Sequence, residues 1–188
     1  MSPPIRPRAA IRPRTTIRPR TESDLDGLVG ALAEVAETDG YPTRWPADPA
    51  GWLRATDVLG AWVAIDDDEA LLGQITLRRP GDQEPVRLWR ARGEPDDCVL
   101  ISRLFVVPAA RRAGLGRALL DTACARAAEL GRRPVLDVVA VNRAAIAMYR
   151  RLGWIEFGHY VERFHDDAPD ELLYCFAAPP SPGPPRRS

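Results

Sequence analysis

Leu104-Phe105-Val106-Val107-Pro108-Ala109-Ala110-Arg111-Arg112-Ala113-Gly114-Leu115-Gly116-Arg117-Ala118 is the stretch that decides the fold. An apolar run ends at Pro108, a short loop follows, and then a long helical pattern begins, which predicts a strand, a tight turn and a helix N-terminus. The first turn of a helix has N–H groups without intrahelical partners and a partial positive charge, so it attracts anions. Glycines allow close backbone approach to such an anion, and arginines add positive charge. The residues that would form this turn are Arg111, Arg112, Gly114, Gly116 and Arg117.

Two common nucleotide-binding motifs fit this turn poorly. A P-loop requires a lysine after its second glycine, and the chain contains no lysine. A dinucleotide-binding fingerprint requires a third glycine where Leu119 stands. Asp137 follows at about the distance that this fingerprint requires, but it lies inside the next apolar run and not at its end.

A third motif fits better. The segment from Arg111 to Gly116 resembles the R/Q-x-x-G-x-G/A motif of the GCN5-related N-acetyltransferase (GNAT) family. Residues 136–154 resemble the second signature of this family, which is a strand, an asparagine, a short helix with a tyrosine, and then glycine and an aromatic residue. Here these are Asn142, Tyr149 and Gly153-Trp154. The resemblance is specific from about residue 100 to 154 and extends over about residues 15–177.

The resemblance implies an α/β fold with a mixed central sheet of about seven strands and helices on both faces. We expect a disordered arm rich in arginine and proline at residues 1–14, one GNAT domain at 15–178 and a disordered, proline-rich tail at 179–188. The first twenty residues contain Ile-Arg-Pro-Arg three times, at Ile5, Ile11 and Ile17, and the last copy is expected to form the first strand. The other strands are expected at 61–65, 71–77, 98–107, 135–141, 154–164 and 172–177, and the helices at 24–39, from Trp52, at 114–130 and at 142–152.

Two segments leave alternatives open. The polar connection from Arg78 to Asp97 is expected to contain a short strand or a contact around Val86, Leu88 and Trp89. Trp45 and Trp52 either wall the acceptor site, as this segment does in the family, or fill the edge of the core.

The resemblance also assigns residues to acetyl transfer. Backbone groups of the strand end would pair with the pantetheine arm of acetyl-CoA, with the Val106 N–H polarising the thioester oxygen. Amides of the turn would hold the pyrophosphate, Arg111 would open the turn, and Asn142 would hydrogen-bond the arm as well as cap its helix. The implied coenzyme-binding residues are Leu104, Phe105, Val106, Arg111, Arg112, Ala113, Gly114, Leu115, Gly116, Arg117 and Asn142.

Tyr149 stands at the general-acid position of the family, seven residues after Asn142. A phenol has a pKa near 10, so it is protonated at neutral pH and can donate to the departing thiolate. The alternative is a tyrosine that only packs against a strand. The catalytic base is open, because the family often has a glutamate where this chain has Leu100, Ile101 and Ser102. A water chain or one of five side chains could serve: Glu94, Asp96, Asp97, His159 or Glu162.

Composition narrows the partners. With 26 basic and 26 acidic residues the formal net charge is zero, which gives no general case for nucleic acid or an anionic membrane. No segment has the length of a membrane span, and three cysteines without metal-type spacing favour reduced thiols in the cytoplasm. The acidic run Asp66–Glu69 has no histidine, so we expect a solvated turn and no metal site.

The sequence therefore predicts an acetyl-CoA-dependent N-acetyltransferase that acts on a primary amine, expected to belong to a small molecule. A peptide or protein acceptor is the alternative within this class. A non-catalytic acyl-CoA-binding sensory module is the alternative outside it. The resemblance also allows a homodimer.

Overall fold

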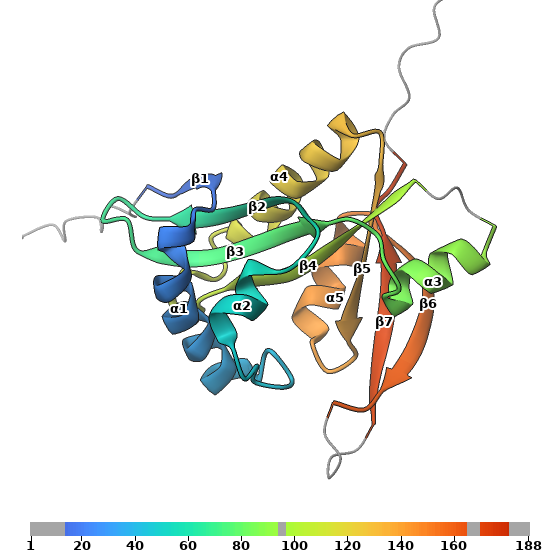
Figure 1. Cartoon of the computed structure of the whole chain (residues 1–188), viewed down its shortest axis with the longest axis horizontal. Coiled ribbons are helices and arrows are strands. Elements are labelled where there is room, and N and C mark those ends of the chain that lie inside the picture. The colour runs from blue at the N-terminus through green and yellow to red at the C-terminus, as the bar shows by residue number, and fades with distance from the viewer. Residues whose placement is uncertain (1–13, 94–96, 165–169, 181–188) are drawn as a thin grey trace, which may run out of the picture.

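The structure, a computed structural model, describes residues 14–93, 97–164 and 170–180. Of the arm predicted at 1–14 and the tail predicted at 179–188, residues 1–13 and 181–188 lie outside the described residues. Within the described part, the strands form one seven-stranded sheet of order β1-β2-β3-β4-β5-β7-β6 (Figure 1). The strands are β1 (Thr16–Pro19), β2 (Val58–Ile65), β3 (Leu71–Arg78), β4 (Cys98–Val106), β5 (Arg133–Val139), β6 (Ile155–Glu162) and β7 (Glu171–Ala177). The helices are α1 (Leu25–Asp39), α2 (Pro49–Arg54), α3 (Glu84–Ala91), α4 (Leu115–Glu129) and α5 (Arg143–Arg151).

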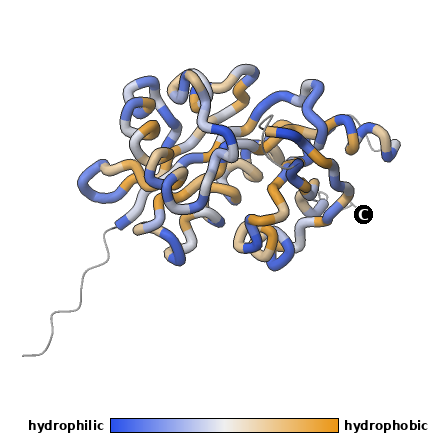
Figure 2. Tube along the Cα trace, turned by 90° about the horizontal axis from the view of Figure 1, so that it is seen from below, coloured by the Kyte–Doolittle hydropathy of each residue, from blue (hydrophilic) through white to orange (hydrophobic). Residues whose placement is uncertain are grey.

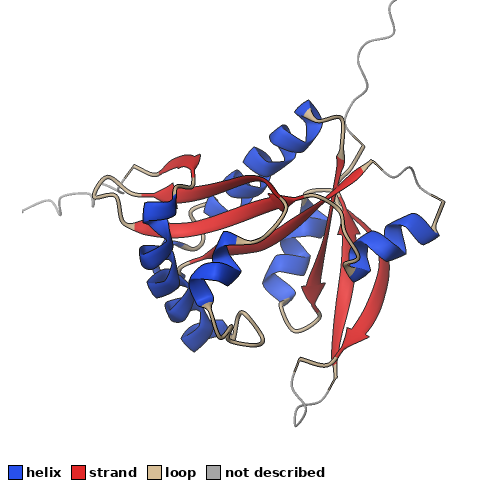
Figure 3. Cartoon of the chain, viewed as in Figure 1, coloured by secondary structure: helices blue, strands red, loops and turns tan. Residues whose placement is uncertain are grey.

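Helices cover both faces of this sheet, as predicted (Figure 3). Helices α4 and α5 pack on one face through the largest apolar cluster, which includes Ile101, Leu119 and Leu136. Helices α1 and α2 pack on the opposite face at the β2–β4 end, and α3 packs on that same face over β4, β5 and β7. The buried residues are almost all apolar, and Figure 2 shows hydrophilic segments at many of the outer turns.

A buried carboxylate holds β1 against the start of α1. Asp24 is 6% exposed and accepts hydrogen bonds from both terminal nitrogens of Arg18 at 2.7 and 2.8 Å. It also accepts from the backbone N–H of Thr21 at 2.7 Å. The Arg18 guanidinium keeps the pKa of this carboxyl well below its usual range. The charge is therefore well satisfied, which a buried carboxylate requires.

The segment before β4 confirms one of the two alternatives left open. We expected a short strand or a contact around Val86, Leu88 and Trp89, and the structure has a contact there, made by the helix α3 and not by a strand. Pro85 occupies the first turn, where its missing N–H is not needed. Val86 and Trp89 are three residues apart, so they share a helix face, and Trp89 packs edge-on against Phe157 of β6 with ring centroids 5.2 Å apart.

The acidic turn between β2 and β3 is a hairpin connection, as predicted. Oδ1 of Asp66 accepts from the backbone N–H groups of Asp68 and Ala70 at 3.0 and 2.9 Å. Among the described residues, no group of three metal-ligating side chains is placed to hold an ion. Asp66 thus shapes the turn through its own backbone contacts.

The feature that positions the site is the parting of β4 and β5. These two strands are parallel, but their pairing covers only three steps and ends with Leu100 beside Val135. Beyond that step, β4 continues to Val106 paired only with β3, and β5 continues paired only with β7. The facing edges of β4 and β5 are therefore unpaired at the end of the sheet that leads into the turn before α4.

Candidate active site

The turn before α4 has the backbone of an anion-binding loop. Arg112 (φ 64°) and Gly114 (φ 82°) both lie in the left-handed region, on either side of Ala113. Alternation of this kind turns successive N–H groups toward one side. A left-handed arginine is unfavourable and is typical of functional sites. The turn is exposed, and it leads directly into the unpaired amides at the start of α4.

The direction of the β4 amides follows from one hydrogen bond. Val107 N–H donates to the Leu72 carbonyl of β3 at 2.8 Å. Because successive peptide groups of a strand point to opposite sides, the Val106 N–H and carbonyl face β5, across the parting. The peptide group of Phe105 faces β3, and its ring packs in the apolar cluster between α1 and the sheet. Of the predicted strand residues, Val106 therefore offers its backbone to the parting, and Phe105 positions it.

Gly116 brings the first turn of α4 against this strand end. A Cβ at Gly116 would lie 3.9 Å from Cγ2 of Val106 and 3.8 Å from Sδ of Met148, which are ordinary contacts. The protein's own packing therefore does not require glycine here. The absence of a side chain keeps the helix amides open to a ligand.

Arg111 is engaged within the protein. Its Nε donates to the Val106 carbonyl at 3.1 Å, and its guanidinium forms an ion pair with Asp39 at the end of α1. Arg117 is exposed and lies 3.4 Å from Asp121 one turn along α4. Arg111 thus ties the turn to both β4 and α1, consistent with its predicted role at the opening of the turn.

Asn142 caps α5 as predicted, because its Oδ1 accepts from the Ala145 N–H at 3.1 Å. Its side chain is exposed. Its amide nitrogen makes no hydrogen bond to another described residue, so it is free to donate to a ligand.

The Tyr149 ring is buried between Trp154 and Phe176, with centroid distances of 5.5 and 5.7 Å. Its hydroxyl makes no hydrogen bond to the described residues and is not among their buried unpaired polar atoms, so it reaches solvent. Burial raises the pKa of this phenol, and Tyr41 and Asp137 raise it further. The phenol is therefore protonated throughout the neutral range, which is the form that a proton donor needs.

The five side chains expected as bases do not converge on this point. Glu94 and Asp96 lie outside the described residues. Asp97 precedes β4 at the end where β4 and β5 are still paired. His159 is exposed and pairs with Tyr174, so by strand alternation it faces away from Tyr160, its neighbour in β6. Glu162 is exposed at the end of β6.

A carboxylate that the sequence analysis had weighed only for the dinucleotide fingerprint lies on β5, one of the two strands that part. Asp137 of β5 accepts a 2.5 Å hydrogen bond from the hydroxyl of Tyr160 in β6, across the intervening strand β7. Burial raises the pKa of Asp137, and the Tyr160 hydrogen bond opposes that rise. Asp137 lies on the α3 face of the sheet, because it stands two residues after Val135 and opposite Cys175, both of which pack in the α3 cluster. The only signal in the sequence was a charged residue inside an apolar strand.

Arg103 is the second residue that the sequence did not reveal. It has φ 53° and lies where the β3–β4 register shifts, a β-bulge. Its guanidinium stacks over Trp52 of α2, 4.7 Å from the ring centroid, so Trp52 lies beside the parting. Burial, followed by Arg78, lowers the pKa of Arg103 to about 10. No carboxylate among the described residues pairs with it.

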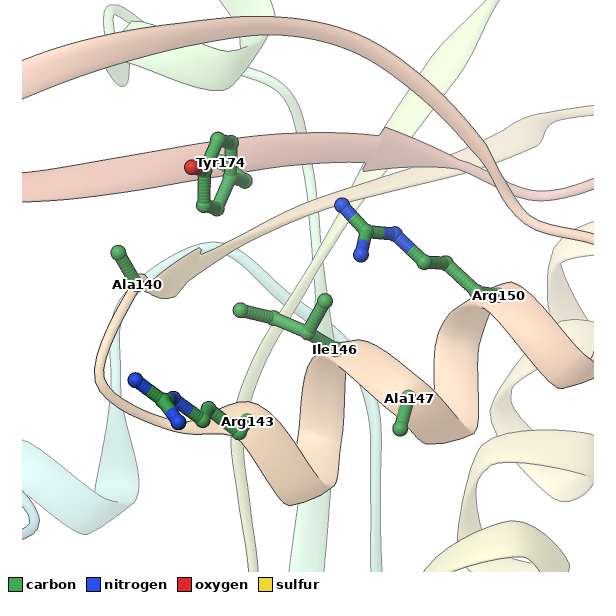
Figure 4. Close-up of a pocket in the computed structure, with 6 residues that line it drawn as sticks. All are labelled: Ala140, Arg143, Ile146, Ala147, Arg150 and Tyr174. Atoms are coloured by element: carbon green, nitrogen blue, oxygen red, sulfur yellow. The ribbon is translucent and has the colours of Figure 1, made fainter.

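A shallow hollow lies on the other side of α5. Figure 4 shows Arg143 and Arg150 of α5 beside Tyr174 of β7, with Ala140, Ile146 and Ala147 around them. Arg150 is paired with Glu156 at 2.9 Å. The hollow faces β7, away from the parting of β4 and β5, so it is separate from the predicted coenzyme residues.

Known acetyltransferases match this chain in a family model and in solved structures. The model of the acetyltransferase (GNAT) family matches residues 28–154. None of the curated proteins compared with the sequence matches it. No described helix has the length and apolarity needed to cross a membrane.

Solved structures share the fold at low sequence identity. The ribosomal-protein-S18-alanine N-acetyltransferase from Escherichia coli is 19% identical, with 93% of this chain and 99% of that chain covered and a TM-score of 0.66. Arabidopsis thaliana NAA60 in complex with a bisubstrate analogue is 22% identical, with 88% and 98% covered and a TM-score of 0.68. An N-acetyltransferase from Staphylococcus aureus Mu50 is 17% identical, with 87% and 97% covered and a TM-score of 0.66.

Proposed function

Because the chain belongs to the GNAT family and is an acetyl-CoA-dependent acetyltransferase, we propose that it acetylates the primary amine of a small molecule by direct attack in a ternary complex. The observation that carries this proposal is the parting of β4 and β5 beside the N-terminus of α4. It leaves the edge of β4 unpaired next to the amides at the start of α4.

The parting also supports the roles that we propose for the coenzyme-binding residues. The Val106 N–H faces it and would polarise the thioester oxygen, and Leu104 and Val106 would pair with the pantetheine arm. The amides from Arg112 to Arg117 would hold the pyrophosphate at the helix N-terminus. Asn142 would donate its free amide to the arm.

The chemical step needs two proton movements. The amine nitrogen attacks the thioester carbonyl carbon, the carbon–sulfur bond breaks, and the thiolate takes the proton of Tyr149. Tyr149 supports this role because its ring is fixed by Trp154 and Phe176 while its hydroxyl has no competing partner among the described residues. The ammonium form of the acceptor must lose a proton before attack.

The acceptor side favours a small substrate over a peptide. A peptide requires an open groove beside the thioester. Trp52 covers Arg103 there, and Tyr41 packs against Trp52 with ring centroids 6.1 Å apart. These aromatic side chains narrow the approach along β4 and support an acceptor that enters end-on.

The three thiols support action in a reducing compartment. Cys98 and Cys175 are buried, and Cys124 is half-buried. Burial raises the pKa of Cys124 and of Cys175 to about 12. Unreactive free thiols fit the expected cytoplasmic location. A homodimer remains our expectation from the family.

The test has two parts. Isothermal titration calorimetry with acetyl-CoA should show binding to the intact chain, and free-thiol release from acetyl-CoA should occur with amines. Thiol release confined to peptides with free N-termini would replace the small-molecule proposal with the peptide alternative. Binding without thiol release for any amine or peptide would favour the sensory module, and no binding would overturn the assignment of the turn.

A further inference from the structure

Two ionisable side chains on the strands that part have no partner of opposite charge among the described residues. Arg103 on β4 pairs with no described carboxylate, and Asp137 on β5 pairs with no described cation. A buried charge without a counter-charge is costly, and proteins keep such charges mainly where function requires them. Trp52 stacks on Arg103 and Tyr160 bonds to Asp137, but neither contact supplies an opposite charge.

Both charges lie on the same face and at nearly the same level. Arg103 contacts α2, and Asp137 lies on the α3 face, so both lie on the side of the sheet opposite α4 and α5. The last β4–β5 step joins Leu100 to Val135, so the parallel register places Asp137 level with Ser102, next to Arg103. Paired strands are ~5 Å apart, and these two strands diverge from that spacing. Arg103 and Asp137 form no ion pair with each other.

Tyr41 lies within electrostatic range of both charges. Arg103 lowers the pKa of Tyr41 and Asp137 raises it, against a larger rise from burial. The same Asp137 raises the pKa of Tyr149. Arg103 and Asp137 therefore both act electrostatically on Tyr41, and Asp137 also acts on the proposed proton donor.

The surroundings of Arg103 are rich in hydrogen-bond donors. Within the described residues, three buried side-chain atoms lack a hydrogen-bond partner: Nε of Arg103, Nε2 of Gln74 and Oγ1 of Thr76. Gln74 presents its amide nitrogen because its Oε1 accepts from Arg20 at 3.1 Å. Thr76 pairs with Ser102 beside Arg103, and both Gln74 and Thr76 are 0% exposed. A guanidinium with an unpaired donor and no carboxylate partner favours an oxyanion.

Resting on the proposed function, we propose that the acceptor is a zwitterionic small molecule, an amine with a carboxylate or similar oxyanion a few bonds from its nitrogen. Arg103 binds the oxyanion, and Asp137, held by Tyr160, receives the ammonium group. The proton lost by the ammonium passes to the Asp137 carboxylate, and the freed amine attacks the thioester while Tyr149 protonates the thiolate. A peptide N-terminus supplies the ammonium but no carboxylate near it, so it leaves Arg103 without a partner.

The test compares matched acceptors on the full chain. Each common α-amino acid is assayed for free-thiol release beside its amide and its decarboxylated amine, together with short peptides. We expect the best acceptors to be free acids, with kcat/KM at least about tenfold above their amides, as loss of a charge-assisted pair predicts. Release with no free acid, or equal or better release with the amides, amines or peptides, would overturn the inference. Acetyl-CoA binding, measured in parallel, reports on the proposed function alone.

A variant pair adds a second readout. Arg103→Gln should raise KM for the best free acid about tenfold and leave both KM for its amide and the Kd of acetyl-CoA unchanged. Arg79→Gln removes the same charge from an exposed side chain and should keep the acid-over-amide preference. A preserved preference in Arg103→Gln would contradict the inference. If Arg103→Gln does not fold, the comparison of acids with amides on the unaltered chain still decides.

Discussion

Tyr160 reaches across a whole strand to Asp137: its hydroxyl donates to Oδ2 at 2.5 Å over the buried Cys175 of β7. The bond fixes a carboxylate that burial would otherwise drive toward its protonated form, because it lowers a pKa that burial raises. Tyr160 is bonded to Asp137, and Tyr41, Tyr149 and Cys175 lie within its electrostatic influence; none of the four is a cation.

Removing that hydroxyl should move the pH profile. In Tyr160→Phe, the pKa of Asp137 rises, so a higher pH is needed to ionise it. The acid limb of kcat/KM should shift upward by about one pH unit, the equivalent of one charge-assisted hydrogen bond. Steady-state rates from pH 5 to 9 measure the shift, with the Kd of acetyl-CoA as a check on folding. An unmoved acid limb would show that Asp137 does not accept the proton.

Tyr149→Phe should separate chemistry from binding. The hydroxyl has no hydrogen-bond partner among the described residues, so stability and the Kd of acetyl-CoA should not change. Loss of the proton donor should lower kcat about 100-fold. Tyr174→Phe, which removes a hydroxyl on the far side of α5, is the matched control and should keep kcat. Full activity in Tyr149→Phe would remove the tyrosine from the mechanism.

Two glycines of the turn should respond differently to alanine. Gly116→Ala meets only contacts of 3.8 and 3.9 Å, so the melting temperature should hold while KM for acetyl-CoA rises about tenfold, because a methyl group enters the anion site. Gly114→Ala places a side chain at φ +82° and should cost about 1–2 kcal/mol of unfolding free energy. Thermal unfolding and acetyl-CoA kinetics distinguish the two effects. An unchanged KM in Gly116→Ala would argue against pyrophosphate binding at this helix.

The ion pair between Asp24 and Arg18 should make the free energy of unfolding depend on pH. Its pKa is depressed in the folded chain by Arg18, so the carboxylate stabilises the fold above the unfolded-state pKa of about 4 and loses that contribution as the pH falls below it. Asp24→Asn should cost about 2 kcal/mol at pH 7, and the difference from the unaltered chain should shrink below about pH 4. Denaturant unfolding at several pH values measures it. Asp26→Asn, at an exposed position two residues later, should have little effect. If Asp24→Asn lowered the free energy of unfolding by the same amount at every pH, the ion pair with Arg18 would not be the source of the stabilisation.

The elements that the sequence predicted are those that depend on interactions between neighbouring residues. The strand, turn and helix around Gly114 and the cap at Asn142 depend on neighbours within a few residues, so the sequence predicted them. Helix α3 was missed because its apolar residues, Val86 and Trp89, are too few to establish a period in a polar segment. Its burial comes from Phe157, which lies far along the chain.

The acceptor side was hidden for a different reason. Arg103 owes its position to a bulge, and Asp137 owes its hydrogen bond to a strand order in which β7 separates β5 from β6. Neither relationship has a local signature, because each depends on which strands become neighbours. What the sequence did contain was one charge inside each of two apolar strands, Arg103 in β4 and Asp137 in β5. Strands buried on both faces are otherwise apolar, so such charges are a usable indicator of function.

The strand order also makes the Asp137–Tyr160 contact depend on β7. Of the described strands, β7 comes last along the sequence, yet it is an inner strand that separates β5 from β6. Among the described residues β6 pairs only with β7, so Tyr160 is held within reach of Asp137 by residues 171–177. The turn before α4 does not share this dependence, because β4 pairs with β3 and β5.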